Sequence, residues 1–161
     1  MEQYEARSKQ ARQDIKVADH MINVTYKFVD DPKILMTVIQ RLMSSVENTM
    51  AAILYYERMY KRIPAFNDSF ESMYNLFKAR LTRRYQINVE YIKLIEELKE
   101  IIDKHKKSPV EFSRKDKFVI CSEDYKMRVV TADKIKNYIN KAKLFHTEAE
   151  RMVKINGRSD V

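Results

Sequence analysis

The sequence predicts an all-α fold, an antiparallel bundle of about five helices with a short β-hairpin or an extended loop before the last helix. The chain has one glycine and three prolines in 161 residues, whereas sheet-rich folds use many tight turns in which glycine supplies a positive φ. Apolar residues recur at spacings of three and four along most of the chain, which is the period of an amphipathic helix. A composition of 45% apolar and 34% charged residues is typical of a globular chain. We expect one domain over residues 1–155 and a frayed tail at 156–161.

The first two helices are predicted over about residues 4–28 and 32–62. We expect Asp31 to be the N-cap of the second helix and Pro32 its first residue, where proline loses no hydrogen bond. Pro64 ends this helix. The apolar positions of the two helices are Ala11, Ile15, Ala18, Ile22 and Tyr26, then Leu35, Ile39, Leu42, Val46, Met50, Ile53 and Leu54.

A third helix is predicted to begin at Asp68, where residues 68–71 resemble a capping box. A fourth helix has apolar residues from Tyr91 to Ile102 and ends in the basic run 104–107, where cations complement the helix dipole. The polar residues 86–88 leave open whether the third and fourth helices are continuous.

Residues 110–131 do not follow the helical period. β-branched and aromatic residues at 117–121 and 125–130 flank the polar residues 122–124, which predicts a β-hairpin. The absence of glycine leaves an extended loop as the alternative. Thr131 is then expected to cap the last helix, whose apolar positions are Ile135, Tyr138, Ile139, Ala142, Phe145, Ala149, Met152 and Val153.

A net charge of +8 permits a polyanionic partner, for which RNA is the candidate. The densest basic group lies on the third helix, where Arg80, Arg83 and Arg84 share one face with Lys78 beside them. Arginine suits phosphate because its planar guanidinium binds two oxygens at once. The alternative is a solvated helix end whose arginines pair with nearby carboxylates.

A second basic group belongs to the predicted hairpin and consists of Arg114, Lys115, Lys117, Lys126 and Arg128. Phe118 and Tyr125 are the aromatic residues beside it. Cations and aromatic rings on an extended ribbon can follow a phosphate backbone and stack on bases. The alternative is a hairpin that covers the bundle as a lid, with its aromatic residues in the core.

Several classes of site are excluded by residue type and spacing. A single cysteine, Cys121, excludes a disulfide framework and a cysteine-based zinc cluster. His20, His105 and His146 lack metal-ligand spacing, and the only glycine, Gly157, excludes a glycine-rich phosphate loop. We therefore predict no catalytic residue, metal or cofactor. The charged first residues and the lack of an apolar run of ~18 residues lead us to expect a cytoplasmic protein with no membrane span.

Two segments of the chain resemble the HEPN superfamily. Residues 42–54 read Leu-Met-Ser-Ser-Val-Glu-Asn-Thr-Met-Ala-Ala-Ile-Leu and are similar to the second helix of that family, in which a small–apolar–Glu triplet precedes an alanine- and leucine-rich end. Residues 11–18 resemble the first helix, with the acidic–apolar pair Asp14-Ile15 followed three residues later by Ala18. The resemblance covers about residues 8–57.

The resemblance implies a bundle of four or five helices, frequently dimeric, in a family that includes ribonucleases and partners of nucleotidyltransferases. Catalytic members carry an arginine followed, after a gap of four to six residues, by a histidine. Residues 83–88 read Arg-Arg-Tyr-Gln-Ile-Asn here, with Asn88 at the candidate histidine position. Because asparagine cannot exchange a proton near neutral pH, the resemblance implies a non-catalytic member.

The sequence is therefore interpreted as a non-catalytic HEPN-like domain that binds RNA or a nucleotidyltransferase-like protein partner and forms a homodimer. One alternative is a helical protein–protein interaction module with no nucleic-acid role. A second alternative is an atypical ribonuclease that uses Arg84 and Asn88.

Overall fold

A computed structural model describes residues 2–108, 110–121 and 126–159 of the chain. These residues form five helical segments and a small three-stranded antiparallel sheet that precedes the last helix. The predicted fold class, a helical bundle with an extended element before its last helix, is confirmed.

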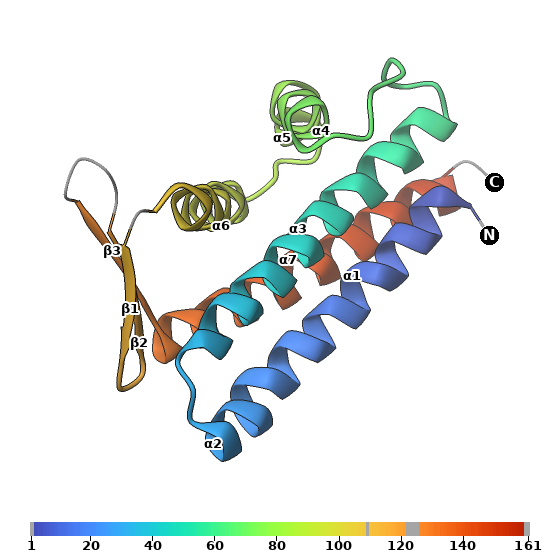
Figure 1. Cartoon of the computed structure of the whole chain (residues 1–161). Coiled ribbons are helices and arrows are strands. Elements are labelled where there is room, and N and C mark those ends of the chain that lie inside the picture. The colour runs from blue at the N-terminus through green and yellow to red at the C-terminus, as the bar shows by residue number, and fades with distance from the viewer. Residues whose placement is uncertain (1, 109, 122–125, 160–161) are drawn as a thin grey trace.

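Three long helices lie side by side and form the frame of the molecule (Figure 1). α3 runs antiparallel to α1, and α7 runs parallel to α3 (Figure 1). This direction arises because the intervening helices and the sheet bring the chain back to the end of the molecule at which α3 begins. α1 continues through a π-helical turn, η1, into α2, and α7 extends into the segment for which the sequence predicted a tail. The bounds are Gln3–His20 for α1, Met21–Thr25 for η1, Tyr26–Val29 for α2, Lys33–Met59 for α3 and Ala132–Ser159 for α7.

Two shorter helical segments cross the frame and are seen end-on in Figure 1. The first runs from α4 through a second π-helical turn, η2, into α5, and the second is α6. The bounds are Phe70–Leu76 for α4, Phe77–Leu81 for η2, Thr82–Arg84 for α5 and Val89–Lys107 for α6. Asn88 caps α6, because its side-chain Oδ1 accepts a hydrogen bond of 2.9 Å from the Glu90 N–H. The third and fourth predicted helices are therefore separate.

The sheet has the order β1-β2-β3, and both pairs of strands are antiparallel. The strands are β1 (Val110–Arg114), β2 (Lys117–Cys121) and β3 (Met127–Thr131). β2 and β3 are the predicted hairpin, whose turn and Tyr125 lie outside the described residues, whereas β1 is a strand that the sequence pattern did not predict. Phe118 is 5% exposed, so this aromatic side chain belongs to the core, as the lid alternative expected.

Local capping follows the sequence in part, since α3 begins at Lys33 with Pro32 at its N-cap position, one residue later than predicted. Thr131 Oγ1 accepts a hydrogen bond from the backbone N–H three residues later, at 3.1 Å, and Asp31 Oδ1 accepts one from the N–H two residues later, at 3.0 Å. The third predicted helix begins later than expected, since Ser69 rather than Asp68 is its N-cap. These contacts depend on residues within one turn, which is why the sequence indicates them.

The chain makes its left-handed turns without glycine. Positive φ angles occur at Asp30, Lys61, Gln86 and Asp116. At Lys61, the Arg62 N–H donates to the Glu57 carbonyl at 3.0 Å and closes a Schellman motif, so α3 ends at Met59, before the predicted end at Arg62. The same motif at Gln86 ends α5. Scarcity of glycine therefore favours helices here without excluding tight turns.

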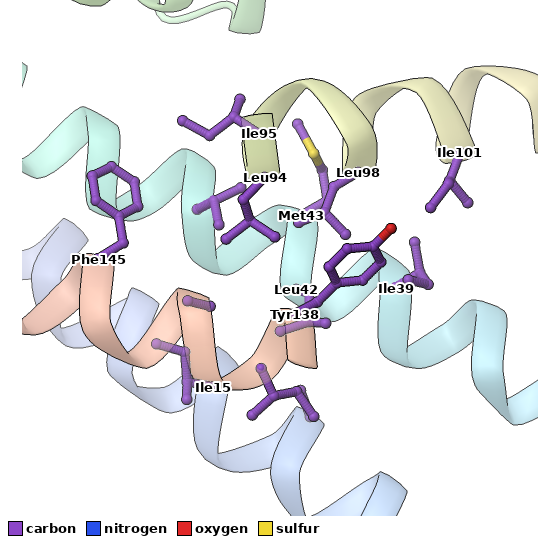
Figure 2. Packing of buried hydrophobic residues seen from close by; sticks show 14 of the residues in the cluster. Ile15, Ile39, Leu42, Met43, Leu94, Ile95, Leu98, Ile101, Tyr138 and Phe145 are labelled. Carbon is purple, nitrogen blue, oxygen red and sulfur yellow. The ribbon is translucent and has the colours of Figure 1, made fainter. Parts of the chain in front are cut away.

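The core lies between α1, α3 and α7 and continues beneath α6 and the sheet. Figure 2 shows side chains from α1, α3, α6 and α7 directed toward one another; those it labels are Ile15, Ile39, Leu42, Met43, Leu94, Ile95, Leu98, Ile101, Tyr138 and Phe145. Tyr138 and Phe145 are among the largest fully buried side chains. Because such rings each remove roughly 150–250 Å² from water, hydrophobic burial holds α7 and α6 to the frame.

A buried carboxylate joins α1 to α3. Asp14 is fully buried, and its Oδ1 accepts hydrogen bonds from Gln10 at 3.0 Å and from Arg41 at 3.2 Å. Its Oδ2 accepts one from the Ser44 hydroxyl at 2.6 Å. Both oxygens therefore have donors and the guanidinium supplies the opposite charge, which offsets the cost of removing the carboxylate from water.

We expect Asp14→Ala to lower the free energy of unfolding by about 3 kcal/mol, because it leaves Arg41 and Ser44 without their acceptor. Equilibrium unfolding in urea, followed by circular dichroism, measures this loss. Asp19→Ala is the matched control, since Asp19 lies on the same helix and pairs with Lys143 at the surface; its expected cost is below about 1 kcal/mol. Equal losses in the two variants would contradict the role assigned to Asp14.

Candidate nucleic-acid interface

The arginine group predicted on the third helix is divided by the structure. Arg84 Nη1 lies 3.4 Å from Glu57 Oε2, and Lys78 Nζ lies 3.3 Å from a Glu96 carboxylate oxygen. Arg80 and Arg83 are exposed, and within the described residues neither has a carboxylate partner. Arg84 and Lys78 therefore pair with carboxylates, as the alternative of a solvated helix end predicted. Arg80 and Arg83 face solvent as cations.

Glu57 is the buried group that attracts Arg84. This carboxylate is fully buried near the end of α3, accepts a hydrogen bond from the Tyr85 hydroxyl and lies 3.6 Å from Arg62 Nη1. The Arg62 guanidinium also lies 4.9 Å from the centroid of the Tyr60 ring. The two Schellman turns bring these side chains to Glu57, so the cluster anchors α5 to α3.

Three lysines from distant parts of the chain line one hollow at the opposite end of α3. Lys27 of α2, Lys117 of β2 and Lys136 of α7 surround a cavity of about 350 Å³. Asp116 and Asp133 line the same cavity. In the part of the chain that the structure describes, none of the three lysines forms an ion pair. Only Lys117 was identified from the sequence, because the fold alone brings Lys27 and Lys136 to it.

The turn between β1 and β2 is fixed at this hollow. The Tyr26 hydroxyl donates to Asp116 Oδ1 at 2.7 Å, and the Ala132 N–H donates to the Asp116 carbonyl at 3.3 Å. Burial, together with the hydrogen bond to Asp116, raises the pKa of Tyr26 to about 12, so the hydroxyl keeps its proton at neutral pH. Asp116 is therefore engaged by α2 and α7, and Lys115 and Lys117 on either side of it are exposed.

An exposed aromatic ring accompanies these lysines. Phe28 follows Lys27 on α2 and is 86% exposed, the highest value among the large hydrophobic side chains described. Val24 and Val29 on the same tip are also exposed. Phe28 does not line the hollow, but it lies on the same short helix as Lys27. A combination of an exposed ring and cations is typical of surfaces that bind single-stranded nucleic acid, because bases stack on the ring while lysines neutralise phosphates.

The second predicted basic group lies partly at this end. Arg114 and Lys115 are exposed at the β1–β2 turn beside Lys117, whereas Arg128 Nη1 lies 4.0 Å from a Glu100 carboxylate oxygen on α6. The β1–β2 turn and the η2–α5 segment lie far apart in the molecule (Figure 1). The two predicted basic groups do not form one surface.

Ser8, His146 and Glu150 gather between α1 and α7. His146 Nε2 lies 3.1 Å from Ser8 Oγ, 3.0 Å from the Ser8 carbonyl and 3.6 Å from a Glu150 oxygen. Because a carbonyl oxygen only accepts, Nε2 carries the proton and cannot take one from Ser8 Oγ. A catalytic triad needs its carboxylate on the other ring nitrogen, so this set is structural.

His105 lies at the end of α6, in the basic run that the sequence assigned to helix capping. Its Nδ1 is 2.8 Å from a Glu111 carboxylate oxygen on β1. The contact links α6 to the sheet at a hollow of about 380 Å³, which is also lined by Lys33 and Ser113. A sequence pattern could not indicate this pair, because β1 itself was not predicted.

We expect the free energy of unfolding to fall between about pH 7 and about pH 5, in part through His146. Burial lowers the pKa of His146, while Glu150 acts in the opposite direction. The unfolded histidine, with a pKa of ~6.5, therefore binds a proton at a higher pH than the folded one, and stability is lost as the pH falls.

His146→Gln, whose amide can donate to the Ser8 carbonyl, should reduce the fall in the free energy of unfolding between these two pH values. Urea unfolding at both pH values measures it. His20→Gln is the control, because His20 is exposed and its replacement should leave the fall unchanged. If the free energy of unfolding of His146→Gln fell as much as that of the wild type, protonation of His146 would not be a cause of the loss.

A second stability test separates two neighbouring arginines. Arg84→Ala should lower the free energy of unfolding by about 1 kcal/mol, because the buried Glu57 loses one of its cations. Arg83→Ala should change it by less than about 0.5 kcal/mol. Thermal and urea unfolding of the two variants measure the difference, and indistinguishable stabilities would argue against the assigned contact.

Within the described residues, no three His, Cys, Asp or Glu side chains are arranged to hold a metal ion. None of the helices described is both long enough and apolar enough to cross a membrane. Comparisons of the chain with protein-family models, with curated proteins and with solved structures found no match.

Proposed function

We propose that the protein binds single-stranded RNA at one end of its bundle, on a surface formed by Lys27, Phe28, Lys115, Lys117 and Lys136 and called the lysine end below. The observation that carries this proposal is the convergence of Lys27, Lys117 and Lys136 on one hollow. The lysines would neutralise successive phosphates, and a base would stack on Phe28.

Electrostatics supports a bound polyanion at this end. Like charges around a hollow repel one another, and a phosphate backbone relieves that repulsion. Two carboxylates, Asp116, which accepts a hydrogen bond from Tyr26, and Asp133, also line the cavity, so the three lysines exceed the anions by one. The net charge of +8 would also speed association with a polyanion at low salt.

The proposal includes membership of the HEPN superfamily, as a non-catalytic, cytoplasmic and homodimeric domain whose other partner is a nucleotidyltransferase-like protein. A helical bundle with a buried, hydrogen-bonded Asp14 on its first helix supports the family resemblance. Binding is favoured over cleavage because Arg84 and Asn88, the pair available to an atypical ribonuclease, pair with Glu57 and cap α6, respectively.

A second candidate function is the docking of a protein partner. The exposed side chains of Val24 in η1 and of Phe28 and Val29 in α2 favour it, since exposed apolar residues that gather on one surface often mark interaction sites. This function would depend on the apolar tip and not on the lysines.

Fluorescence anisotropy with a labelled single-stranded RNA tests the RNA proposal. We expect binding at ~50 mM salt that weakens steeply at ~200 mM, because phosphate contacts release counterions. Replacing Lys27, Lys117 and Lys136 together by alanine should weaken binding by at least roughly tenfold and reduce the slope of log K against log salt by about 2. Phe28→Ala should weaken it by roughly fivefold or more through lost stacking.

The matched control is the double variant Arg80→Ala/Arg83→Ala, which removes two exposed cations far from the lysine end. It should keep wild-type affinity within about twofold. Loss of binding in this control instead would move the site to the arginine group. No binding at the lower salt would overturn the RNA proposal and leave docking of a protein, and cleavage of the RNA would favour the ribonuclease alternative.

A further inference from the structure

A third cavity lies at the end of the frame opposite the lysine end. It has a volume of about 440 Å³ and lies between the first half of α1 and the second half of α7, with α3 beside both. Cavities that bind small molecules commonly have volumes of ~300–1,000 Å³. This cavity is therefore large enough for a small organic ligand, and it is separate from the lysine end.

Small side chains leave this cavity open. Ala52 of α3 and Ala149 of α7 line it and are themselves buried, so no long side chain fills the space between the helices. Val153 and Tyr4 add apolar surface, and the Tyr4 ring is held by an edge-on contact with Tyr56 at 5.2 Å between centroids. These walls suit an apolar or aromatic body.

The polar groups on the inner side of the cavity already have partners. His146 is 7% exposed, and its Nε2 donates to the Ser8 carbonyl. The Thr49 hydroxyl donates to the Ser45 carbonyl at 2.8 Å. An apolar ligand body would therefore cover these groups without leaving a buried donor unpaired, which keeps the cost of binding low.

Cations outnumber anions around the cavity. The charged side chains that line it are Lys9, Arg12 and Lys154 against Glu5 and Glu150. Arg12 pairs with Glu150, whereas in the described part of the chain no carboxylate pairs with Lys9 or Lys154. These two lysines come from α1 and α7, so an anionic group at the rim can contact both sides of the cavity.

We propose that this cavity binds a small amphipathic anion, with its apolar or aromatic body against Ala52 and Ala149 and its carboxylate, sulfonate or phosphate group near Lys9 and Lys154. The size of the cavity and its apolar walls suit a small organic body, and the two lysines without carboxylate partners suit its anionic group. The inference is independent of RNA binding at the lysine end.

The probe for this site is 8-anilinonaphthalene-1-sulfonate, an aromatic anion whose fluorescence rises in apolar surroundings. Titrated into the full chain, it should bind saturably with one site per chain. N-phenyl-1-naphthylamine, which has the same rings without the sulfonate, should bind at least roughly fivefold more weakly, because it cannot contact the lysines. Equal affinity for the two probes would overturn the assignment of an anion site.

Two variants locate the probe. Ala149→Leu should weaken binding by at least roughly tenfold because the larger side chain occupies the cavity. Lys9→Gln/Lys154→Gln changes only exposed side chains and should weaken binding of the sulfonate by at least roughly fivefold while leaving the neutral probe unchanged. Circular dichroism checks that each variant is folded, and the lysine variant decides the outcome if Ala149→Leu does not fold.

The matched control is Lys16→Gln/Lys143→Gln, which removes one exposed lysine from α1 and one from α7 away from this cavity. It should bind the sulfonate within about twofold of wild type. The triple lysine-end variant should also bind the probe normally, so failure of RNA binding and failure of this site are distinguishable. Unchanged probe binding in Lys9→Gln/Lys154→Gln would overturn the proposal.

Discussion

The packing of α1 against α3, with the Asp14 carboxylate buried in it, is the interaction on which the rest of the structure depends. A buried carboxylate must meet its donors, so Arg41 and Ser44 fix how far α1 can slide along α3. That register sets where both ends of α1 lie along α7. It places Lys9 at the cavity between α1 and α7 and Lys27 of α2 at the hollow of the lysine end.

Among the described residues, the two buried carboxylates, Asp14 and Glu57, are paired with arginines and not with lysines. Arginines neutralise buried carboxylates: Arg41 contacts Asp14, and Arg62 and Arg84 contact Glu57. The lysines at the two proposed sites have no carboxylate partner among the described residues, whereas other lysines, such as Lys78 and Lys143, pair with carboxylates at the surface. This division follows from the planar guanidinium, which matches a carboxylate and is weakly hydrated, whereas the ammonium group keeps its water. Of the predicted arginine group, only Arg84 belongs to the Glu57 cluster, and lysines that are far apart in the sequence line the candidate site.

The frame separates two surfaces of different character. The lysine end is an exposed surface with several cations and an aromatic ring. Its residues Lys27 and Phe28 lie on α2, which directly follows the π-helical turn η1, and such turns are frequent at functional sites. The cavity at the other end combines apolar walls with charged residues, and Ala52 and Ala149 leave it open because their side chains are small. A long polymer suits the first surface and a small molecule suits the second.

The sequence by itself determined that the chain folds as a helical bundle with an extended element before its last helix, and it indicated the cap at Thr131, because those features depend on residues within about one turn or one strand of each other. It offered the β2–β3 hairpin only as one of two alternatives, and it placed the cap of α4 at Asp68 instead of Ser69. It did not lead us to predict β1, because the alternation in its five residues, Val-Glu-Phe-Ser-Arg, is too short to distinguish a strand from a loop, and the strand is defined by its pairing with β2. Only the tertiary structure decided that Arg84 meets Glu57, that His146 meets Ser8, and that lysines from α2, β2 and α7 share a hollow. Such contacts join residues far apart in the chain, and the relative directions and register of α1, α3 and α7 set them.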